Sequence, residues 1–473
     1  MSPNPRLVLT VVLALAVVTP ASTVAFASPA SADGSQTQAP STQLSAPSTQ
    51  WDPSPGGVDP VESGGDGDAR SDDRGDARSD NGTVAPANGS ALDAALRAET
   101  RGYALSTVIG SEQNTTNYLD IADGDVEREG YARTGSDAVG AIERNVARIR
   151  SNYTTRSFSH AHETATESET VTGIRSEVTR LESEIEALSE RHRTAIDRYT
   201  DGTWTSERFL RELSTLDAEA RGIDARFEHL EDSVILPLPT NLRTEIQALK
   251  IELVSLRGPV RAHIGDAIVG DRDPFVVYTA ASRDGLVTAY TDDQLLFREA
   301  FLGSNRADTG PNRFVSEDDP RGFSAADQRA KELYPWAYAY GGGGVDTFVN
   351  TTIYQVSLDN PHGILDVYLD GRTTDAFREI QRKGLDLLPT DPVENTSDGV
   401  HLRINRTHGT GPMELTVTNE TGAPLNATVT VNGYHVGATG ADGRLWTVTP
   451  SLGVDVAVET ADGRTVTLTY SPD

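Results

Sequence analysis

The sequence predicts an α+β multidomain fold: an N-terminal helical bundle or antiparallel coiled coil, duplicated helix-plus-β-hairpin modules and a small C-terminal β-sandwich. Three observations lead to this prediction. Apolar residues follow helical spacing from about 90 to 260, and two similar stretches within 261–390 alternate around glycine-containing turns. Residues 400–473 form short alternating segments separated by hairpin turns. The length of 473 residues allows two to four domains.

Residues 1–27 have the pattern of a secretory signal. Arg6 precedes an apolar run from Leu7 to Val18, which is too short to cross a bilayer. Small-residue cleavage sites end at Ala27 and Ala32, so we expect cleavage after one of them and an extracellular or cell-surface protein. The alternative is an uncleaved signal that anchors the chain in the membrane, because a looser apolar stretch follows the run.

Residues 28–88 are rich in Ser, Pro, Gly, Gln and Asp and contain almost no large apolar residue. Such a segment buries too little surface to offset its chain entropy, so we expect a disordered acidic linker. A repeated Gly-Asp-Ala-Arg-Ser-Asp unit at 67–72 and 75–80 lacks the ligand spacing of a calcium loop.

Residues 89–260 contain three apolar stripes whose members step by three and four, which is the pattern of helix-on-helix packing. Short breaks at 201–203 and 237–239 separate the stripes, so neighbouring helices should run antiparallel. The stripes consist of Ile174, Val178, Leu181, Ile185 and Leu188; of Phe209, Leu213, Leu216, Ala220, Ile223, Phe227 and Leu230; and of Leu242, Ile246, Leu249, Leu253 and Leu256.

An earlier stripe predicts one more helix. It consists of Val139, Ile142, Val146, Ile149 and Tyr153. Apolar stripes of this kind usually belong to a protein core, but a dimerising coiled coil has the same spacing. A homodimer through the helices is therefore the alternative interpretation of these stripes.

Two similar stretches within 261–390 predict a duplicated module. Each alternates apolar and polar residues around a glycine-containing turn, which is typical of a β-hairpin, and a helical segment precedes each. Gly285, Tyr290 and Asp292 recur 78 residues later, and Phe297-Arg-Glu recurs 80 residues later as Phe377-Arg-Glu.

The second stretch resembles a PepSY hairpin in Tyr354-Gln-Val356, Gly363 and Val367-Tyr-Leu-Asp370-Gly-Arg-Thr373. That family prefers Gly where this chain has Thr374. PepSY domains are non-catalytic and occur in peptidase propeptides and exported proteins, so the resemblance implies a binding or inhibitory role. It transfers no functional residue.

The four glycines at 341–344 are predicted to form a flexible loop, because the strand, helix and Lys of a phosphate-binding loop are missing around them. The aromatic residues before them alternate as in a strand. We expect these side chains to pack in the core, with stacking on sugars as the alternative: Tyr334, Trp336, Tyr338 and Tyr340.

The C-terminal region, 400–473, is predicted to form six strands. They cover His401–Thr407, Met413–Asn419, Ala427–Asn432, Arg444–Thr449, Val454–Glu459 and Thr465–Tyr470. The turns carry Asn-Gly and Asp-Gly pairs. The stretch Gly422–Gly433, with Thr439–Leu445, resembles the carboxypeptidase regulatory-like (transthyretin-like) domain, and this resemblance implies a structural accessory without chemistry.

The chain has 41 Lys and Arg against 70 Asp and Glu, a formal net charge of −29. Only Lys250, Lys331 and Lys383 are lysines. Dense carboxylates with little Lys are typical of proteins from halophilic archaea, where concentrated salt screens the repulsion. The acidity argues against nucleic-acid binding. The chain resembles exported surface proteins of such archaea.

No catalytic residue, metal ligand or cofactor is predicted. The sequence lacks Cys and the common nucleophile, zinc-protease and nucleotide motifs, and His160 and His162 have no partner ligands at metal-binding spacing. Nine Asn-x-Ser/Thr sequons are candidate N-glycosylation sites: Asn81, Asn88, Asn114, Asn152, Asn350, Asn395, Asn405, Asn419 and Asn426.

The predicted function is that of a non-enzymatic exported scaffold or binding protein with a protein or cell-envelope partner. One alternative, from the PepSY resemblance, is an inhibitor or chaperone-like partner of an exported peptidase. The other is a hydrolase with an unrecognised carboxylate site.

Overall fold

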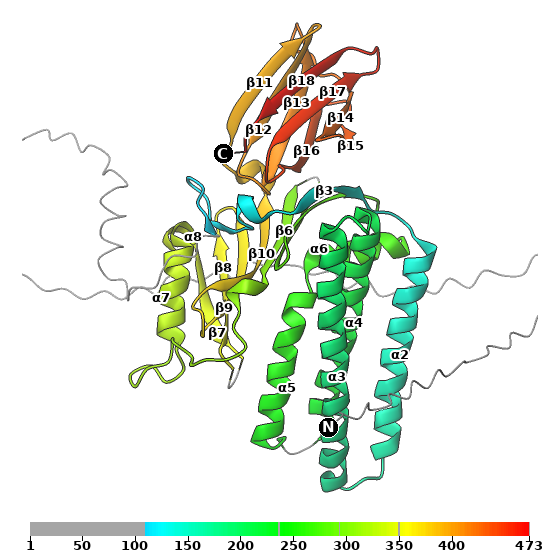
Figure 1. Cartoon of the computed structure of the whole chain (residues 1–473), viewed down its shortest axis with the longest axis vertical. Helices are drawn as coiled ribbons and strands as arrows, with labels where there is room; N and C mark the ends of the chain where they lie inside the picture. Colours follow the sequence, from blue (N-terminus) through cyan, green and yellow to red (C-terminus); the bar gives the residue numbers. More distant parts are fainter. Residues whose placement is uncertain (1–108, 235–236, 293, 349–350, 473) are drawn as a thin grey trace, which may run out of the picture. The chain divides into compact units, whose positions relative to one another are not determined.

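The computed structural model describes residues 109–472 apart from 235–236, 293 and 349–350. The predicted α+β multidomain fold is confirmed. The described residues form a helical bundle at 138–269, an eight-stranded antiparallel sheet with helices, and two C-terminal four-stranded sheets (Figure 1). The predicted signal and linker, at 1–27 and 28–88, lie outside the described residues.

The bundle contains α2 (Ala138–His162), α3 (Glu167–Thr200), α4 (Ser206–Asp232), α5 (Thr240–Glu252) and α6 (Pro259–Val269). Polar caps define where its longest helices begin. The Asp137 side chain accepts hydrogen bonds from the first turn of α2, Thr166 and Glu169 form a capping box on α3, and Thr205 caps α4. These caps satisfy amide groups that the helices leave unpaired.

The three predicted stripes at 174–256 form the core of the bundle. Their members on α3, α4, α5 and the 3-10 turn Leu253–Leu256 are buried, except Leu249, which is partly buried. The helical prediction begins too early, however. Residues 109–133 instead contain the strands β1 (Ile109–Gly110), β2 (Tyr118–Leu119) and β3 (Arg128–Arg133), with a 3-10 turn at Asp123–Asp125.

The large sheet has the strand order β3-β4-β5-β6-β10-β9-β8-β7. Its remaining strands are β4 (Val276–Ala281), β5 (Gly285–Thr291), β6 (Leu295–Leu302), β7 (Gly342–Thr347), β8 (Ile353–Asn360), β9 (Gly363–Asp370) and β10 (Ala376–Gly384). The helices α7 (Phe323–Leu333) and α8 (Pro335–Tyr340) lie between its two halves in sequence, and 3-10 turns occur at Gly303–Asn305 and Leu385–Leu387.

The two predicted hairpin modules are the two halves of this one sheet. They meet where β6 pairs with β10, so the two Phe-Arg-Glu repeats lie on adjacent strands. Arg298 is opposite Gln381 and Phe301 is opposite Arg378. The two repeats therefore lie on strands that pair directly with each other at the centre of the sheet.

Two predictions for the segment that joins the modules are wrong. The glycines at 341–344 do not form a loop, because β7 takes in residues 342–347 and pairs with β8 along the sheet edge. The aromatic residues do not form a strand: Pro335 begins the short helix α8. Tyr334 is fully buried as expected, whereas Tyr340 is exposed.

The C-terminal sandwich contains the six predicted strands with small shifts at their ends. They are β12 (Val400–Arg406), β13 (Pro412–Asn419), β14 (Ala427–Val431), β16 (Arg444–Val448), β17 (Val454–Thr460) and β18 (Thr465–Tyr470). The strands β11 (Asp391–Ser397) and β15 (Tyr434–Ala438) were not predicted. Both lie at sheet edges and are largely exposed, so their sequences lack clear alternation.

The sandwich contacts the large sheet through backbone groups. Thr291 on β5 donates a hydrogen bond to the carbonyl of Trp446 at 3.0 Å, and the amide of Ser451 donates to Glu129 on β3 at 2.8 Å. Among the described residues, no helix combines the length and the apolar character needed to cross a bilayer.

Candidate interaction surface

Helix α2 exposes its apolar residues. The predicted stripe of Val139, Ile142, Val146, Ile149 and Tyr153, here called the α2 stripe, is 52–73 % exposed. The equivalent stripes on α3 and α4 are almost fully buried. Scattered single apolar residues on a surface need no explanation, but five in helical register along one face are typical of an interaction site.

The opposite face of α2 contacts the bundle mainly through small and polar residues, and Phe158 near its end packs against the bundle core. Gly140 is the one residue of α2 that is buried in the described structure. Arg144 donates to the carbonyl of Ser214 at 2.9 Å, and Ser151 donates to the carbonyl of Gly222 at 3.1 Å. The apolar face of this helix is thus directed away from the protein to which it is attached, opposite to the usual arrangement.

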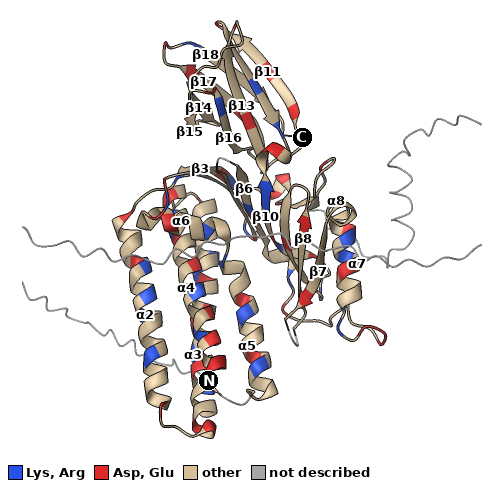
Figure 2. Cartoon of the chain, turned by 180° about the vertical axis from the view of Figure 1, so that it is seen from behind, with Lys and Arg blue, Asp and Glu red and all other residues tan. Residues whose placement is uncertain are grey.

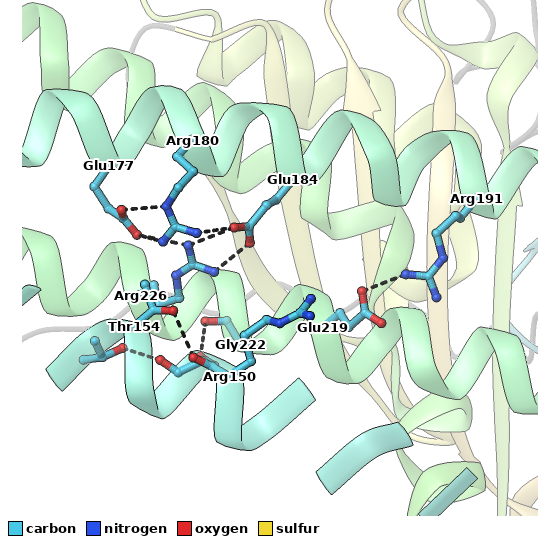
Figure 3. Close-up of polar contacts among 11 residues, drawn as sticks. Arg150, Thr154, Glu177, Arg180, Glu184, Arg191, Glu219, Gly222 and Arg226 are labelled. Atoms are coloured by element: carbon cyan, nitrogen blue, oxygen red, sulfur yellow. Dashed lines mark hydrogen bonds and ion pairs between the residues drawn. The ribbon is translucent and has the colours of Figure 1, made fainter. Parts of the chain in front are cut away.

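A groove of about 1140 Å³ separates α2 from α3, with α4 and α6 at its base. Its lining combines apolar residues, among them Ile142 and Val146 of the α2 stripe, with ionic side chains of α3 and α4. Arg226 bonds Glu184 at 2.7 Å and Glu177 at 3.0 Å, and Arg191 bonds Glu219 at 2.8 Å (Figure 3). These ionic side chains of α3 and α4 therefore pair with each other along one side of the groove.

The charges on α2 differ from those of the chain as a whole. The helix contains four Arg and one Glu, a net charge of +3, whereas the chain carries −29. Arg148 and Arg150 are exposed, and so is Glu143. In the described part of the chain, the side chains of Glu143 and Arg150 form no ion pair. Both charges flank the α2 stripe and are accessible to a partner.

The centre of the large sheet contains a second group of charges, which is buried. On one face Arg298 bonds Glu379 at 2.9 Å, and on the other Arg378 bonds Glu299 at 2.9 Å. All four side chains are 1 % exposed or less. These residues belong to the two Phe-Arg-Glu repeats, so each buried ion pair joins the Arg of one repeat to the Glu of the other. The repeat is visible in the sequence, whereas its burial is not.

On the Glu379 side the cluster continues into the sandwich. The hydroxyl of Thr410 accepts from Arg298 at 2.9 Å and donates to Asp120 at 2.8 Å, and Tyr334 donates to Glu379 at 2.7 Å. Burial raises the pKa of Asp120 to about 6, although Arg298 opposes the shift. Burial also lowers the pKa of Lys383 to about 8, and Glu379 opposes that shift. The cluster thus joins the large sheet to the sandwich.

Asp120 gives a prediction for the pH dependence of stability. Because its pKa is raised in the folded state, the folded state binds the proton more tightly, and stability falls as the pH rises from about 4 to about 6. We expect Asp120→Asn to remove this part of the pH dependence. The free energy of unfolding of the variant, relative to that of wild type, should therefore rise by about 2 kcal/mol from pH 4 to pH 7. Denaturant titrations at constant salt measure the difference, and parallel pH profiles for the two proteins would contradict it.

The described sequons differ in accessibility. Asn114, Asn152 and Asn426 are exposed, and no hydrogen bond engages their side-chain amides in the described structure. Asn395 is exposed but its amide donates to the carbonyl of Thr467 at 2.7 Å. Asn405, which donates to Glu414, and Asn419, whose side chain holds a turn, are partly buried. Asn81, Asn88 and Asn350 lie outside the described residues.

Three family models match consecutive parts of the chain. Residues 106–273 match a domain of unknown function, DUF7096, and residues 277–389 match a family of unknown function, DUF7094. Residues 391–467 match the archaeal fibronectin-III type-like domain. This is an archaeal protein with three such parts. The border between the first two matches lies between β3 and β4, so the large sheet takes its first strand from the DUF7096 part.

The matches correct two resemblances. Neither a PepSY nor a carboxypeptidase regulatory-like family model matches the chain. Asp370 and Thr373 fix the turn after β9, where Asp370 accepts from the amide of Arg372 at 2.9 Å, and Thr374 has a positive φ of 70°. These features, like the Asn-Gly turns of the sandwich, belong to many antiparallel sheets and identify no family. No curated protein and no solved structure matches the chain.

Proposed function

We propose that this is a non-enzymatic, exported surface protein of a halophilic archaeon, which binds a macromolecular partner through the α2 stripe. The exposure of five apolar residues on one face of a 25-residue helix is the observation that carries the proposal. The archaeal fibronectin-III type-like domain fits a surface protein, and so do the sequons and the acidic composition.

The other two functions have less support. An inhibitor or chaperone of an exported peptidase was suggested by the PepSY resemblance, which the family matches do not support. A hydrolase needs accessible carboxylates. The two carboxylates beside Arg298 whose pKa is raised, those of Asp120 and Glu379, instead lie in the packed contact between domains. An assay panel on peptides and polysaccharides tests this second alternative, and turnover would contradict the non-enzymatic proposal.

Site-specific photo-crosslinking in an archaeal host tests the proposed surface. A photoreactive amino acid replaces Val146 in the α2 stripe, and in a matched control it replaces Leu452 on the sandwich; these residues are 52 % and 50 % exposed. We expect discrete adducts from position 146 in the envelope or secreted fraction, and none from position 452. An absence of adducts at position 146, or equal labelling at both positions, would contradict the proposal.

A further inference from the structure

The α2 stripe has the geometry of a coiled-coil seam without its partner helix. Its members step by three, four, three and four, so they occupy the a and d positions of successive heptads. The stripe is about 21 Å long, at 1.5 Å per residue. Such seams need a second helix with the same spacing, and in the described chain the other helices with this spacing, α3, α4 and α5, already bury their apolar stripes in the core.

An antiparallel second copy of α2 pairs four of the five stripe residues with apolar partners and leaves Val139 beyond the seam. In antiparallel coiled coils an a residue lies opposite a d residue. With the two-fold axis between Ala147 and Arg148, Val146 faces Ile149 of the second copy, and Ile142 faces Tyr153 of the second copy. Each contact occurs twice, as in any isologous interface. The seam is then closed by four apolar layers.

The charges beside the stripe are complementary in this arrangement alone. Glu143 and Arg150 occupy equivalent positions one heptad apart on the same flank, and in the antiparallel pair each faces the other in the second copy. In a parallel pair Glu143 would face the neutral Ala138 and Arg150 would face Asn145. The antiparallel pair therefore supplies partners for two exposed charges that have none in the described chain.

From the spacing, exposure and flanking charges we propose that the partner at the α2 stripe is a second copy of this chain, which pairs antiparallel through α2. The proposal rests on the proposed function and names the partner of that same surface. The interface is short, so we expect a weak dimer with a dissociation constant on the order of 10 µM. Association should strengthen in concentrated salts that favour apolar burial.

The sequon at Asn152 gives a consequence of this arrangement. Asn152 precedes Tyr153 and is exposed beside the seam, where Asn145 of the second copy would face it. A glycan on Asn152 would separate the two helices. Asn152 should therefore be unmodified in the paired protein. Asn114 and Asn426 lie in loops between strands, outside α2, and can carry glycans without affecting the seam.

Disulfide trapping tests the register. The chain contains no Cys, so introduced cysteines have no background. A mixture of tagged Val146→Cys and untagged Ile149→Cys is expected to give a mixed disulfide dimer on mild oxidation. Val139→Cys alone should give none, because its two copies would lie about 25 Å apart in the antiparallel pair. A disulfide from Val139→Cys, or none from the mixture, would contradict the proposed register.

Sedimentation equilibrium of the full chain tests the energetics. Ile149→Asp should raise the dissociation constant of the dimer about 100-fold, because both copies place the introduced charge in the seam. Leu452→Asp should have no effect. Glu143→Arg and Arg150→Glu should each weaken the dimer at the lowest salt that keeps the fold, and the double variant should restore it. Circular dichroism confirms that the variants remain folded.

The outcomes separate this inference from the proposed function. If wild type remains a monomer at 100 µM while Val146 still gives crosslinked adducts of another mass in cells, the second copy is excluded and the binding surface stands. If Val146 gives no adduct in cells and the purified chain is monomeric, both are wrong. A dimer that Ile149→Asp leaves unchanged would place the interface elsewhere and contradict the inference.

Discussion

Replacing Glu299 by Leu is expected to destabilise the protein by about 4 kcal/mol, because it leaves two buried guanidinium groups without their carboxylate. The Glu299 carboxylate bonds Arg378 at 2.9 Å and lies 3.5 Å from Arg261, and both Arg side chains are 1 % exposed. It also accepts from the amide of Val260 at 2.5 Å, in the first turn of α6. Burial lowers the pKa of Arg261 to about 10, and Glu299 opposes that shift.

An exposed ion pair is the control for this variant. Glu190 and Arg193 lie 2.9 Å apart on α3, with side chains 68 % and 71 % exposed. Glu190→Leu should change the free energy of unfolding by less than about 0.5 kcal/mol. Denaturant titration in constant salt compares the two variants. Similar losses for both would mean that the paired charges at the sheet centre contribute no more than surface charges.

Removal of salt is the second large effect, and it is expected to unfold the chain completely. Screening reaches about 3 Å at 1 M salt and about 30 Å at 0.01 M, so the repulsion within a chain of net charge −29 acts over the whole bundle in dilute buffer. Acidic residues are spread over the helices, the sheet and the sandwich (Figure 2). Salt screens that repulsion wherever it arises.

Circular dichroism during stepwise dialysis from molar KCl measures this effect. The signal should be lost in dilute buffer and return when KCl is restored. Sucrose is the control: it stabilises compact states by exclusion but screens no charge, so it should not replace KCl. A folded protein in dilute buffer would contradict the assignment to a halophile and leave the acidic composition unexplained.

Sequence patterns predicted the helices well because their apolar stripes are local features. The stripes on α2 and α4 have the same spacing, however, and this spacing does not distinguish the exposed stripe from the buried one. Spacing defines an apolar face but not what covers it, which depends on tertiary packing. The small residues that α2 turns toward α4, such as Gly140 and Ser151, were the available signal.

The sheet and its charges could be predicted only in part. The repeat at Phe297 and Phe377 indicated duplication, but the pairing of β6 with β10 joins residues about 80 apart, and no local pattern specifies such a contact. Arg298 and Glu379 read as surface residues in the sequence, because burial of a charge depends on a partner that only the fold supplies. The polar edge strand β11 was missed for lack of alternation.

The mass of the purified chain in solution tests the central claim most directly. Light scattering in molar KCl, over a concentration range that spans 10 µM, should show wild type rising from about 50.6 kDa toward twice that mass. Ile149→Asp should remain at the monomer mass across the same range. A wild-type mass that stays at the monomer value at every concentration would contradict the pairing of two copies through α2.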